Sequence, residues 1–372
     1  MGRQKQERNG GFLVHWEAII PHLFTPIPRG ADVPLHQTLE RWWQGGHPPW
    51  WGGLLLPASH LYGWIAHQRN RRYDRHPPSP LEGVVVSIGN ITVGGSGKTP
   101  VTIDLTRHLQ KRGLKVVVVS RGYGGSGRGE ICLEDLSPTE QATVGGDEPT
   151  LIHRSTGAPV VVGAQRAAAC RLALRRYRPD LIVLDDALQH RAVHRDLNVV
   201  VVGRSGWGNG HYLPAGPLRE PVVDALARCD WVVHFGPLPP DCTGLPATAA
   251  ATTAGPWCDG NLTPCPPPPS GTTVTLYSAI AQPERVVATL AQQGIGVAAR
   301  ITQRDHAHPG PRQWRAIDQR PTPLWVTTAK DAVRLPPERQ ADPALKVVTL
   351  ELIWDPSPLI DQIAHRVASR SF

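Results

Sequence analysis

Short apolar runs recur between residues 84 and 202 and define the centre of the expected fold. They are apolar throughout rather than alternating, which is typical of strands buried on both faces of a parallel sheet. The runs span residues 84–88, 115–120, 159–162, 181–184 and 198–202. Helical patterns separate several of them, as in residues 100–112 and the alanine-rich 164–177. The alternation predicts a doubly wound α/β domain over residues 81–236.

The regions on either side of this domain have different patterns. Residues 1–40 contain four prolines and predict an irregular extension. Residues 237–272 are rich in proline, threonine and alanine, without periodicity, and predict a long linker. Apolar and helical patterns return in residues 273–372, which predict a smaller C-terminal α/β unit.

Residues 41–80 form an aromatic and basic helical segment whose role the pattern leaves open. Six of the 12 tryptophans precede residue 65, and arginines follow the apolar stretch. The six are Trp16, Trp42, Trp43, Trp50, Trp51 and Trp64. Tryptophan and arginine favour the boundary between membrane and water, so a membrane-interfacial helix is one interpretation. A helix packed on the protein's own core is an equal alternative.

Composition narrows the class of partner. The 39 Lys and Arg residues against 31 Asp and Glu give a net charge of +8, which suits anionic partners. The sequence has no recognisable nucleic-acid-binding module, so nucleic acid is not expected. Six cysteines without a Cys-x-x-Cys pair predict free thiols in a reducing cytosol, and the polar first residues do not form a secretory signal.

The stretch "SIGNITVGGSGKTP" (87–100) places a glycine-rich turn between a strand and a helix. In such a turn backbone N–H groups surround a phosphate, Lys98 reaches the terminal phosphates and Thr99 can hold Mg²⁺. A strict P-loop has glycine at the position of Thr92. The predicted phosphate-binding residues are Thr92, Val93, Gly94, Gly95, Ser96, Gly97, Lys98 and Thr99.

The stretch "LIVLDDALQH" (181–190) is a second candidate element of a nucleotide site. A buried strand ending in two aspartates is typical of a Walker-B strand that delivers a carboxylate to Mg²⁺. Asp185, Asp186 and Gln189 are the candidate Mg²⁺ ligands beside Thr99. The alternative is an aspartate that only caps the next turn.

Three further polar clusters follow along the chain, and each alone would be interpreted as a solvated turn. They are "SRGYGG" (120–125), "GGDEPT" (145–150) and "GWGNGHYLPAGPLREP" (206–221). Together with the two motifs above and a later "DHAHP", their order resembles the tetraacyldisaccharide 4′-kinase family, the lipid A 4′-kinases, over about residues 50–365. The segment "LLLPASHLYGWI" (54–65) resembles that family's membrane-associated helix.

The resemblance implies a P-loop NTPase fold that uses ATP and Mg²⁺ to phosphorylate the 4′-hydroxyl of tetraacyldisaccharide 1-phosphate. It implies that Asp147, paired with His306, accepts the sugar's proton and that Lys98 assists catalysis. The chain has Ala187-Leu188 where the family has Gly-Phe, and Ala329 where the family has Glu in Thr-Glu-Lys-Asp.

The expected partners follow from the same resemblance. They are an acylated glucosamine disaccharide 1-phosphate and the lipid surface of the inner membrane, at its cytoplasmic face, with no obligate protein partner. Arginine matches phosphate bidentately, so Arg121, Arg166 and Arg219 are expected to bind phosphate on the substrate or ATP. The predicted substrate-binding residues are Arg121, Tyr123, Arg166, Asn209 and Arg219.

Two other classes share the P-loop topology. A membrane-recruited NTPase switch, of partitioning or metallochaperone type, would not require the clusters at 145–150 and 206–221. An ATP-dependent ligase similar to dethiobiotin synthetase would leave the aromatic N-terminal segment without a purpose.

Overall fold

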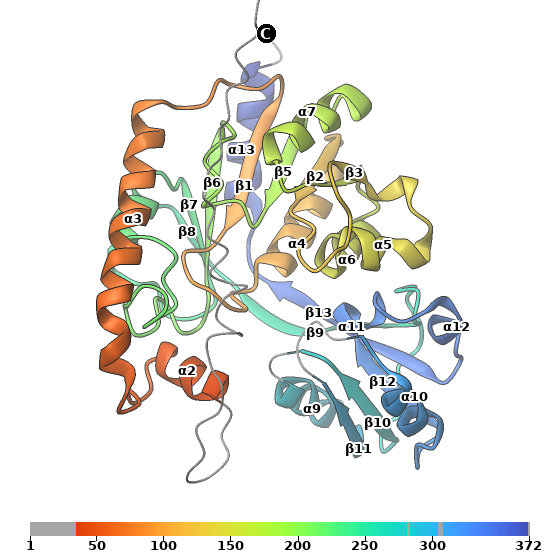
Figure 1. The fold of residues 1–372 in the computed structure, drawn as a ribbon. Helices are drawn as coiled ribbons and strands as arrows, with labels where there is room; N and C mark the ends of the chain where they lie inside the picture. Colours follow the sequence, from red (N-terminus) through yellow and green to blue (C-terminus); the bar gives the residue numbers. More distant parts are fainter. Residues whose placement is uncertain (1–34, 281–282, 304–307, 371–372) are drawn as a thin grey trace, which may run out of the picture.

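The computed structural model describes residues 35–280, 283–303 and 308–370, which form two α/β units (Figure 1). The first unit is built on an eight-stranded sheet in the order β3-β4-β2-β5-β1-β6-β7-β8. Its strands are β1 (Val84–Gly89), β2 (Val116–Ser120), β3 (Ile131–Cys132), β4 (Val160–Val162), β5 (Leu181–Asp185), β6 (Leu197–Val202), β7 (Trp231–His234) and β8 (Ala247–Ala249). The five apolar runs are β1, β2, β4, β5 and β6, so those predictions are confirmed.

Neighbouring strands of this sheet are parallel except for the short edge pair β3 and β4. Strand β1 lies between β5 and β6, and the chain winds away from it in both directions. In a doubly wound sheet, ligands bind where the strand order reverses, at the carboxyl ends of the strands. The loops after β1 and β5 therefore meet at one edge.

Helices cover both faces of the large sheet, which explains its continuous apolar strands. One face packs against α4 (Lys98–Lys111), α6 (Asp147–Thr156) and α13 (Ser357–Arg370). The other packs against α7 (Arg166–Tyr177), α8 (Val222–Leu226) and the loop 206–221. Helix α5 (Pro138–Gly145) and the 3-10 turns η3 (Leu133–Asp135) and η4 (Pro240–Cys242) complete this unit.

The second unit contains a five-stranded sheet in the order β11-β10-β12-β13-β9. Its strands are β9 (Ala251–Cys258), β10 (Thr273–Ser278), β11 (Gly296–Thr302), β12 (Leu324–Thr328) and β13 (Leu345–Ile353), and only the β13–β9 pair is antiparallel. Its helices are α9 (Pro283–Gln292), α10 (Pro311–Asp318), α11 (Ala329–Ala332) and α12 (Pro337–Gln340).

The expected linker 237–272 is not irregular throughout, because it contains β8 and β9. Most of their side chains are exposed or half-buried, and pairing with β7 and β13 holds them in place. The strands therefore lack the apolar pattern that would have revealed them. Helix α13 likewise lies in the expected C-terminal unit but packs on the first sheet (Figure 1).

The N-terminal segment forms α2 (Leu35–Trp43), η2 (Gly52–Leu55) and α3 (Leu56–Arg75), so residues 35–40 are helical rather than irregular. Helix α3 runs along the outside of the first unit (Figure 1). Ser59 Oγ donates to the Tyr212 carbonyl at 2.7 Å, and a Cβ at Gly63 would lie 2.4 Å from the Tyr212 ring. Among the described helices, none is long and apolar enough to cross a membrane.

Candidate active site

The glycine-rich turn joins β1 to α4 at the carboxyl edge of the large sheet. Gly97 has a φ of 90°, and a Cβ there would lie 2.6 Å from the Phe235 ring, so glycine is required for both reasons. Gly94 and Gly95 are exposed with nothing within 4 Å of a built Cβ. Among the described atoms, the Ser96 hydroxyl is buried and has no hydrogen-bond partner. An open loop with an unsatisfied buried hydroxyl suits an anionic ligand.

The loop 206–221 is hydrogen-bonded to the first half of this turn. Thr92 pairs with Leu218 in an isolated bridge, and the Val93 N–H donates to the Pro217 carbonyl at 2.8 Å. The Arg219 N–H donates to the Ile91 carbonyl, also at 2.8 Å. The Val93 amide is therefore occupied, which leaves residues 94–99 as the open part of the predicted phosphate loop.

Asp185 ends β5 and is 2% exposed. Its carboxylate accepts hydrogen bonds from Thr102 Oγ1 at 3.0 Å and Ser120 Oγ at 3.2 Å. Burial, with additional repulsion from Glu148 and Asp186, raises the pKa of Asp185 to about 7. A buried carboxylate with so high a pKa suits a position beside a cation.

Asp186 follows in a left-handed conformation, with φ of 48° and a side chain 32% exposed. Lys98 Nζ lies 3.6 Å and Arg219 Nη1 3.4 Å from Asp186 Oδ1. Burial alone would raise the pKa of Asp186, but the charges of Arg219 and Lys98 outweigh it and lower the pKa to about 2. The site thus keeps one carboxylate ionised beside the phosphate-loop lysine. Carboxylate and hydroxyl oxygens of this kind are ligands that Mg²⁺ prefers.

Gln189 is part of a buried hydrogen-bond network. Its Nε2 donates to the Asn90 carbonyl at 2.7 Å and to Glu220 Oε1 at 2.9 Å. Asn90 Oδ1 accepts from Lys98 Nζ at 3.2 Å, so the network ends at the phosphate loop. Glu220 is completely buried and also accepts from Asn70 and Arg228. Gln189 therefore braces the loop, and Mg²⁺ ligation by it stays a prediction.

Arg121 and Tyr123 line a cavity of about 510 Å³ whose walls are formed largely by glycines between residues 122 and 129. Arg166 is buried nearby and donates to the Gly163 carbonyl at 2.8 Å. Burial, aided by the charge of Arg121, lowers the pKa of Arg166 to about 10. The same surroundings lower the pKa of His190 to about 4, chiefly through its burial, so it is neutral at physiological pH.

Asn209 serves its own loop in the structure. Its Nδ2 donates to the Ala215 carbonyl at 3.0 Å, and its Oδ1 accepts from the His211 N–H.

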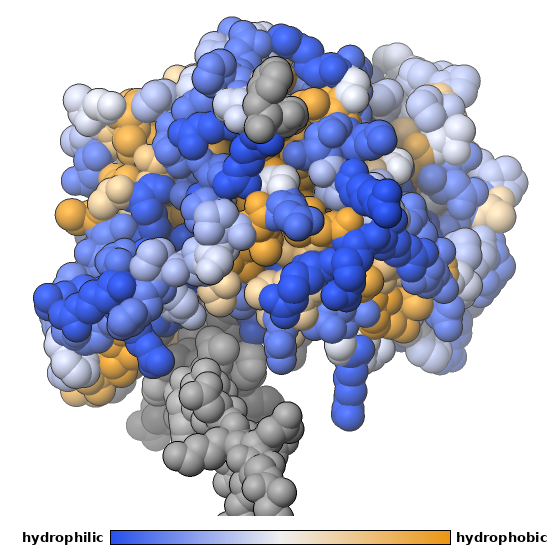
Figure 2. All heavy atoms as spheres, turned by 90° about the horizontal axis from the view of Figure 1, so that it is seen from above, coloured by the Kyte–Doolittle hydropathy of each residue, from blue (hydrophilic) through white to orange (hydrophobic). Residues whose placement is uncertain are grey.

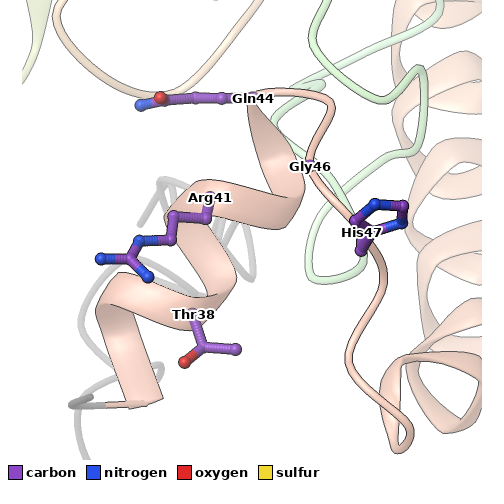
Figure 3. A pocket seen from close by; sticks show the side chains of 5 residues that line it. All are labelled: Thr38, Arg41, Gln44, Gly46 and His47. Carbon is purple, nitrogen blue, oxygen red and sulfur yellow. The ribbon is translucent and has the colours of Figure 1, made fainter.

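Another cavity, of about 530 Å³, lies at α2 and the turn after it (Figure 3). Arg41 and Gln44 extend to one side there, with His47 apart on the loop, and none of the residues that line this cavity belongs to the predicted site.

Asp147 is the first residue of α6 and is buried. Arg334 of the second unit donates to Asp147 Oδ2 from Nε at 3.0 Å and also from Nη2. Lys330 Nζ lies 3.5 Å from Glu148 Oε1. His306, the expected partner of Asp147, lies outside the described residues, so that pairing stays a prediction.

Sequence reasoning gave no role to four residues of this region: Asn90, Glu220, Lys330 and Arg334. Asn90, Glu220 and Lys330 stand inside motifs described above, and Arg334 lies three positions after the last of these motifs. Their partners lie between about 8 and 190 positions away along the chain, and no spacing rule connects them.

Half of the large exposed apolar side chains among the described residues lie in the N-terminal segment. Trp50 is 92% and Trp64 60% exposed, whereas Trp42 is buried against Leu39 and Ala215. Leu54, Leu61 and Ile65 are also exposed. The face seen from above, at the C-terminal ends of α3 and α13, is mainly hydrophilic with scattered apolar patches (Figure 2). Trp42 thus packs on the protein's own core, whereas a membrane-interfacial role for the exposed Trp50 and Trp64 stays a prediction.

A glycine-rich loop before a helix, a lysine on it and an acidic strand end beside it define a P-loop nucleotide-binding protein. The model of the tetraacyldisaccharide-1-P 4′-kinase family matches residues 51–368. The tetraacyldisaccharide 4′-kinase of Methylibium petroleiphilum is 39% identical over 89% of this chain and 92% of its own. The tetraacyldisaccharide 4′-kinase of Gluconacetobacter diazotrophicus is 35% identical over 88% of this chain and 99% of its own.

The crystal structure of LpxK from Aquifex aeolicus in complex with ATP superposes with a TM-score of 0.70, at 26% identity, over 85% of this chain and 99% of that one. The chain belongs to the tetraacyldisaccharide 4′-kinase family. This membership confirms the fold class and decides against the switch and ligase alternatives.

Proposed function

We propose that this chain transfers the γ-phosphoryl group of ATP to the 4′-hydroxyl of tetraacyldisaccharide 1-phosphate in lipid A synthesis. The observation that carries the proposal is the convergence of the phosphate loop, Asp185, Asp186 and Asp147 at one edge of the sheet. Glu148, next to Asp147, lies near enough to Asp185 to raise its pKa. The family relatives are named for this reaction.

In this mechanism residues 94–99 hold the triphosphate, and Lys98 neutralises charge on its outer phosphates. Asp147 accepts the proton of the 4′-hydroxyl as its oxygen bonds to the γ-phosphorus. The bond from that phosphorus to the β-phosphate oxygen breaks, and ADP leaves. Thr99, Asp185 and Asp186, with Gln189 beside them, would hold Mg²⁺, which neutralises charge on the β- and γ-phosphates when bound.

The acceptor site in this proposal is the cavity beside Arg121 and Tyr123. Arg121 and Arg166 supply positive charge for a phosphate, and Tyr123, which is 55% exposed, offers a ring to a sugar. Arg219 stands at Asp186 and would stabilise the transferred phosphoryl group. Asn209 contributes by shaping the loop 206–221.

The acyl chains of the acceptor require the enzyme to work at a lipid surface. The exposed tryptophans and leucines at residues 50–65, with exposed Arg71, Arg72 and Arg75 further along α3, support peripheral binding to the cytoplasmic face of the inner membrane.

The test is incubation of the full chain with ATP, Mg²⁺ and tetraacyldisaccharide 1-phosphate, followed by mass spectrometry of the lipid. The bisphosphate should form with the wild type and be absent with Lys98→Ala. ADP release without a phosphorylated lipid would contradict the proposal.

A further inference from the structure

Helix α6 carries the proposed base and is also the surface on which the second unit docks. Asp147 bonds to Arg334, and Glu148 pairs with Lys330. About two turns further along α6, Arg154 Nη1 donates to Gln340 Oε1 at 3.1 Å. All three partners belong to the second unit, whose α11 lies beside α6 (Figure 1). The second unit is thus bonded directly to the helix that presents the base.

The Arg334 guanidinium is also fixed by hydrogen bonds to groups of the second unit. Its side chain is 2% exposed. Nη1 donates to Asp331 Oδ1 at 3.2 Å and to the Ala279 carbonyl at 3.3 Å. Asp331 is itself fixed, because it accepts from the Ala279 N–H at 3.2 Å and from Thr328 Oγ1 at 2.8 Å. Because these groups hold Nη1, the two nitrogens of the guanidinium that bond to Asp147 have little freedom to move.

The bonds from Arg334 to Asp147 end on a single oxygen, Oδ2, from two nitrogens of the guanidinium. Such charge-assisted bonds orient a carboxylate and favour its ionised form. Among the residues that the structure describes, the other charged groups next to this pair are Glu148 beside Asp147 on α6, and Lys330 and Asp331 on α11. Lys330 and Asp331 are in ion pairs of their own, with Glu148 and Arg334 respectively.

We propose that Arg334 is a positioning residue for the reaction: it orients Asp147 and keeps it deprotonated until the 4′-hydroxyl arrives. The second unit therefore completes the active site by holding the base. This inference rests on the proposed function, since it requires Asp147 to be the base. It adds that the base works only when a residue nearly 190 positions away is in place.

The experiment compares Arg334→Gln and Arg334→Lys with the wild type by measuring kcat against pH at saturating ATP and lipid acceptor. Arg334→Gln removes the guanidinium that orients Asp147, so kcat at neutral pH should fall about tenfold or more while KM for ATP stays close to that of the wild type. The acid limb of the profile should move up by about one pH unit, because the base is protonated more easily. Arg334→Lys keeps the charge but not the geometry, so kcat should fall with the acid limb unchanged.

The matched control is Arg339→Gln, which removes a guanidinium paired with Asp318 on the surface of the second unit and should leave the profile unchanged. If Arg334→Gln does not fold, Arg334→Lys decides, since wild-type kcat in that variant overturns the inference. An unshifted acid limb in folded Arg334→Gln also overturns it. Asp147→Asn separates the two proposals: if Asp147→Asn keeps wild-type activity, the base assignment itself fails.

Discussion

Asp185 and Asp186 are adjacent in the chain, yet their surroundings give them opposite acid–base properties. Asp185 is enclosed by hydroxyl groups at the end of β5, and burial raises its pKa to about 7. Asp186 turns toward Lys98 and Arg219, whose charges overcome its burial and lower its pKa to about 2. The pair resembles acid–base sites in which environment rather than residue type assigns the roles.

The first prediction concerns the stability cost of Asp185. Its folded-state pKa lies above the ordinary value of 3.8, so the folded protein loses stability as pH rises from about 4 to about 7 and keeps that loss above pH 7. In the absence of Mg²⁺ at pH 8, the free energy of unfolding of Asp185→Asn should therefore exceed that of the wild type by about 1–4 kcal/mol. The variant should accordingly unfold at a higher urea concentration. The two proteins should differ little near pH 4, and urea titrations at both pH values measure this.

Asp186→Asn is the matched control for that experiment. Its pKa is already lowered, so neutralising it should give no gain in stability between pH 4 and pH 8. An equal gain in both variants would show that general charge repulsion, rather than burial of Asp185, sets the effect.

At the scale of the element, α3 has two faces with different purposes. The inward face is bonded to the nucleotide domain through Ser59, Asn70 and His67, which contact Tyr212, Glu220 and Asp224 respectively. The outward face begins with exposed Leu61, Trp64 and Ile65, spaced along one side of the helix, and ends in arginines. A helix fixed on one side and apolar on the other is suited to bind a lipid surface.

The second prediction tests that face together with the exposed apolar residues just before α3. The triple variant Trp50→Ser, Leu54→Ser, Trp64→Ser should lose about tenfold or more in affinity for anionic phospholipid vesicles, because the apolar area buried in lipid is removed. Its thermal midpoint should stay near that of the wild type, since all three side chains are exposed. Vesicle co-sedimentation and thermal unfolding give the two readouts.

Leu350→Ser with Ile353→Ser is the control, because these residues are 58% and 61% exposed on β13 and away from α3. Unchanged vesicle binding in the triple variant, or an equal loss in the β13 variant, would rule out the assigned surface.

At the scale of the whole molecule, the chain leaves the first unit and returns to it. It crosses through β9, builds the second sheet and comes back along β13 to α13. Trp354 Nε1 donates to Asp104 Oδ2 of α4 at 2.6 Å, just before α13 reaches the large sheet. Leu359, Ile360 and Ile363 are then buried in the core of the first unit.

The third prediction follows from this return. Deleting residues 357–372 should unfold the first unit, because three buried side chains contribute about 1.5–3 kcal/mol each against a total stability of about 5–15 kcal/mol. Leu359→Ala alone should lower the free energy of unfolding by about 2–5 kcal/mol. Circular dichroism and nucleotide binding of the truncated chain measure the loss. A truncated chain that still binds ATP would mean that the first unit folds without α13.

How far the sequence could predict this protein depended on the distance over which each signal acts. Strands β1, β2, β4, β5 and β6 were predictable because burial on both faces demands continuous apolar residues. The glycine-rich turn between β1 and α4 was predictable because its strand, glycine and helix signals are neighbours in the chain. Strand β9 was not, because an edge strand is held by backbone pairing with β13 and leaves no apolar pattern.

The sequence by itself determined the α/β class, the glycine-rich turn before α4 and the order of the polar clusters, since these follow from local composition and spacing. Only the tertiary structure decided that Asp147 meets Arg334, that Glu220 joins α3 to Gln189 and that α13 closes the first sheet. The physical reason is that ion pairs and buried hydrogen bonds depend on where the backbone brings side chains together. The sequence around a charged residue does not indicate which distant residue it will pair with.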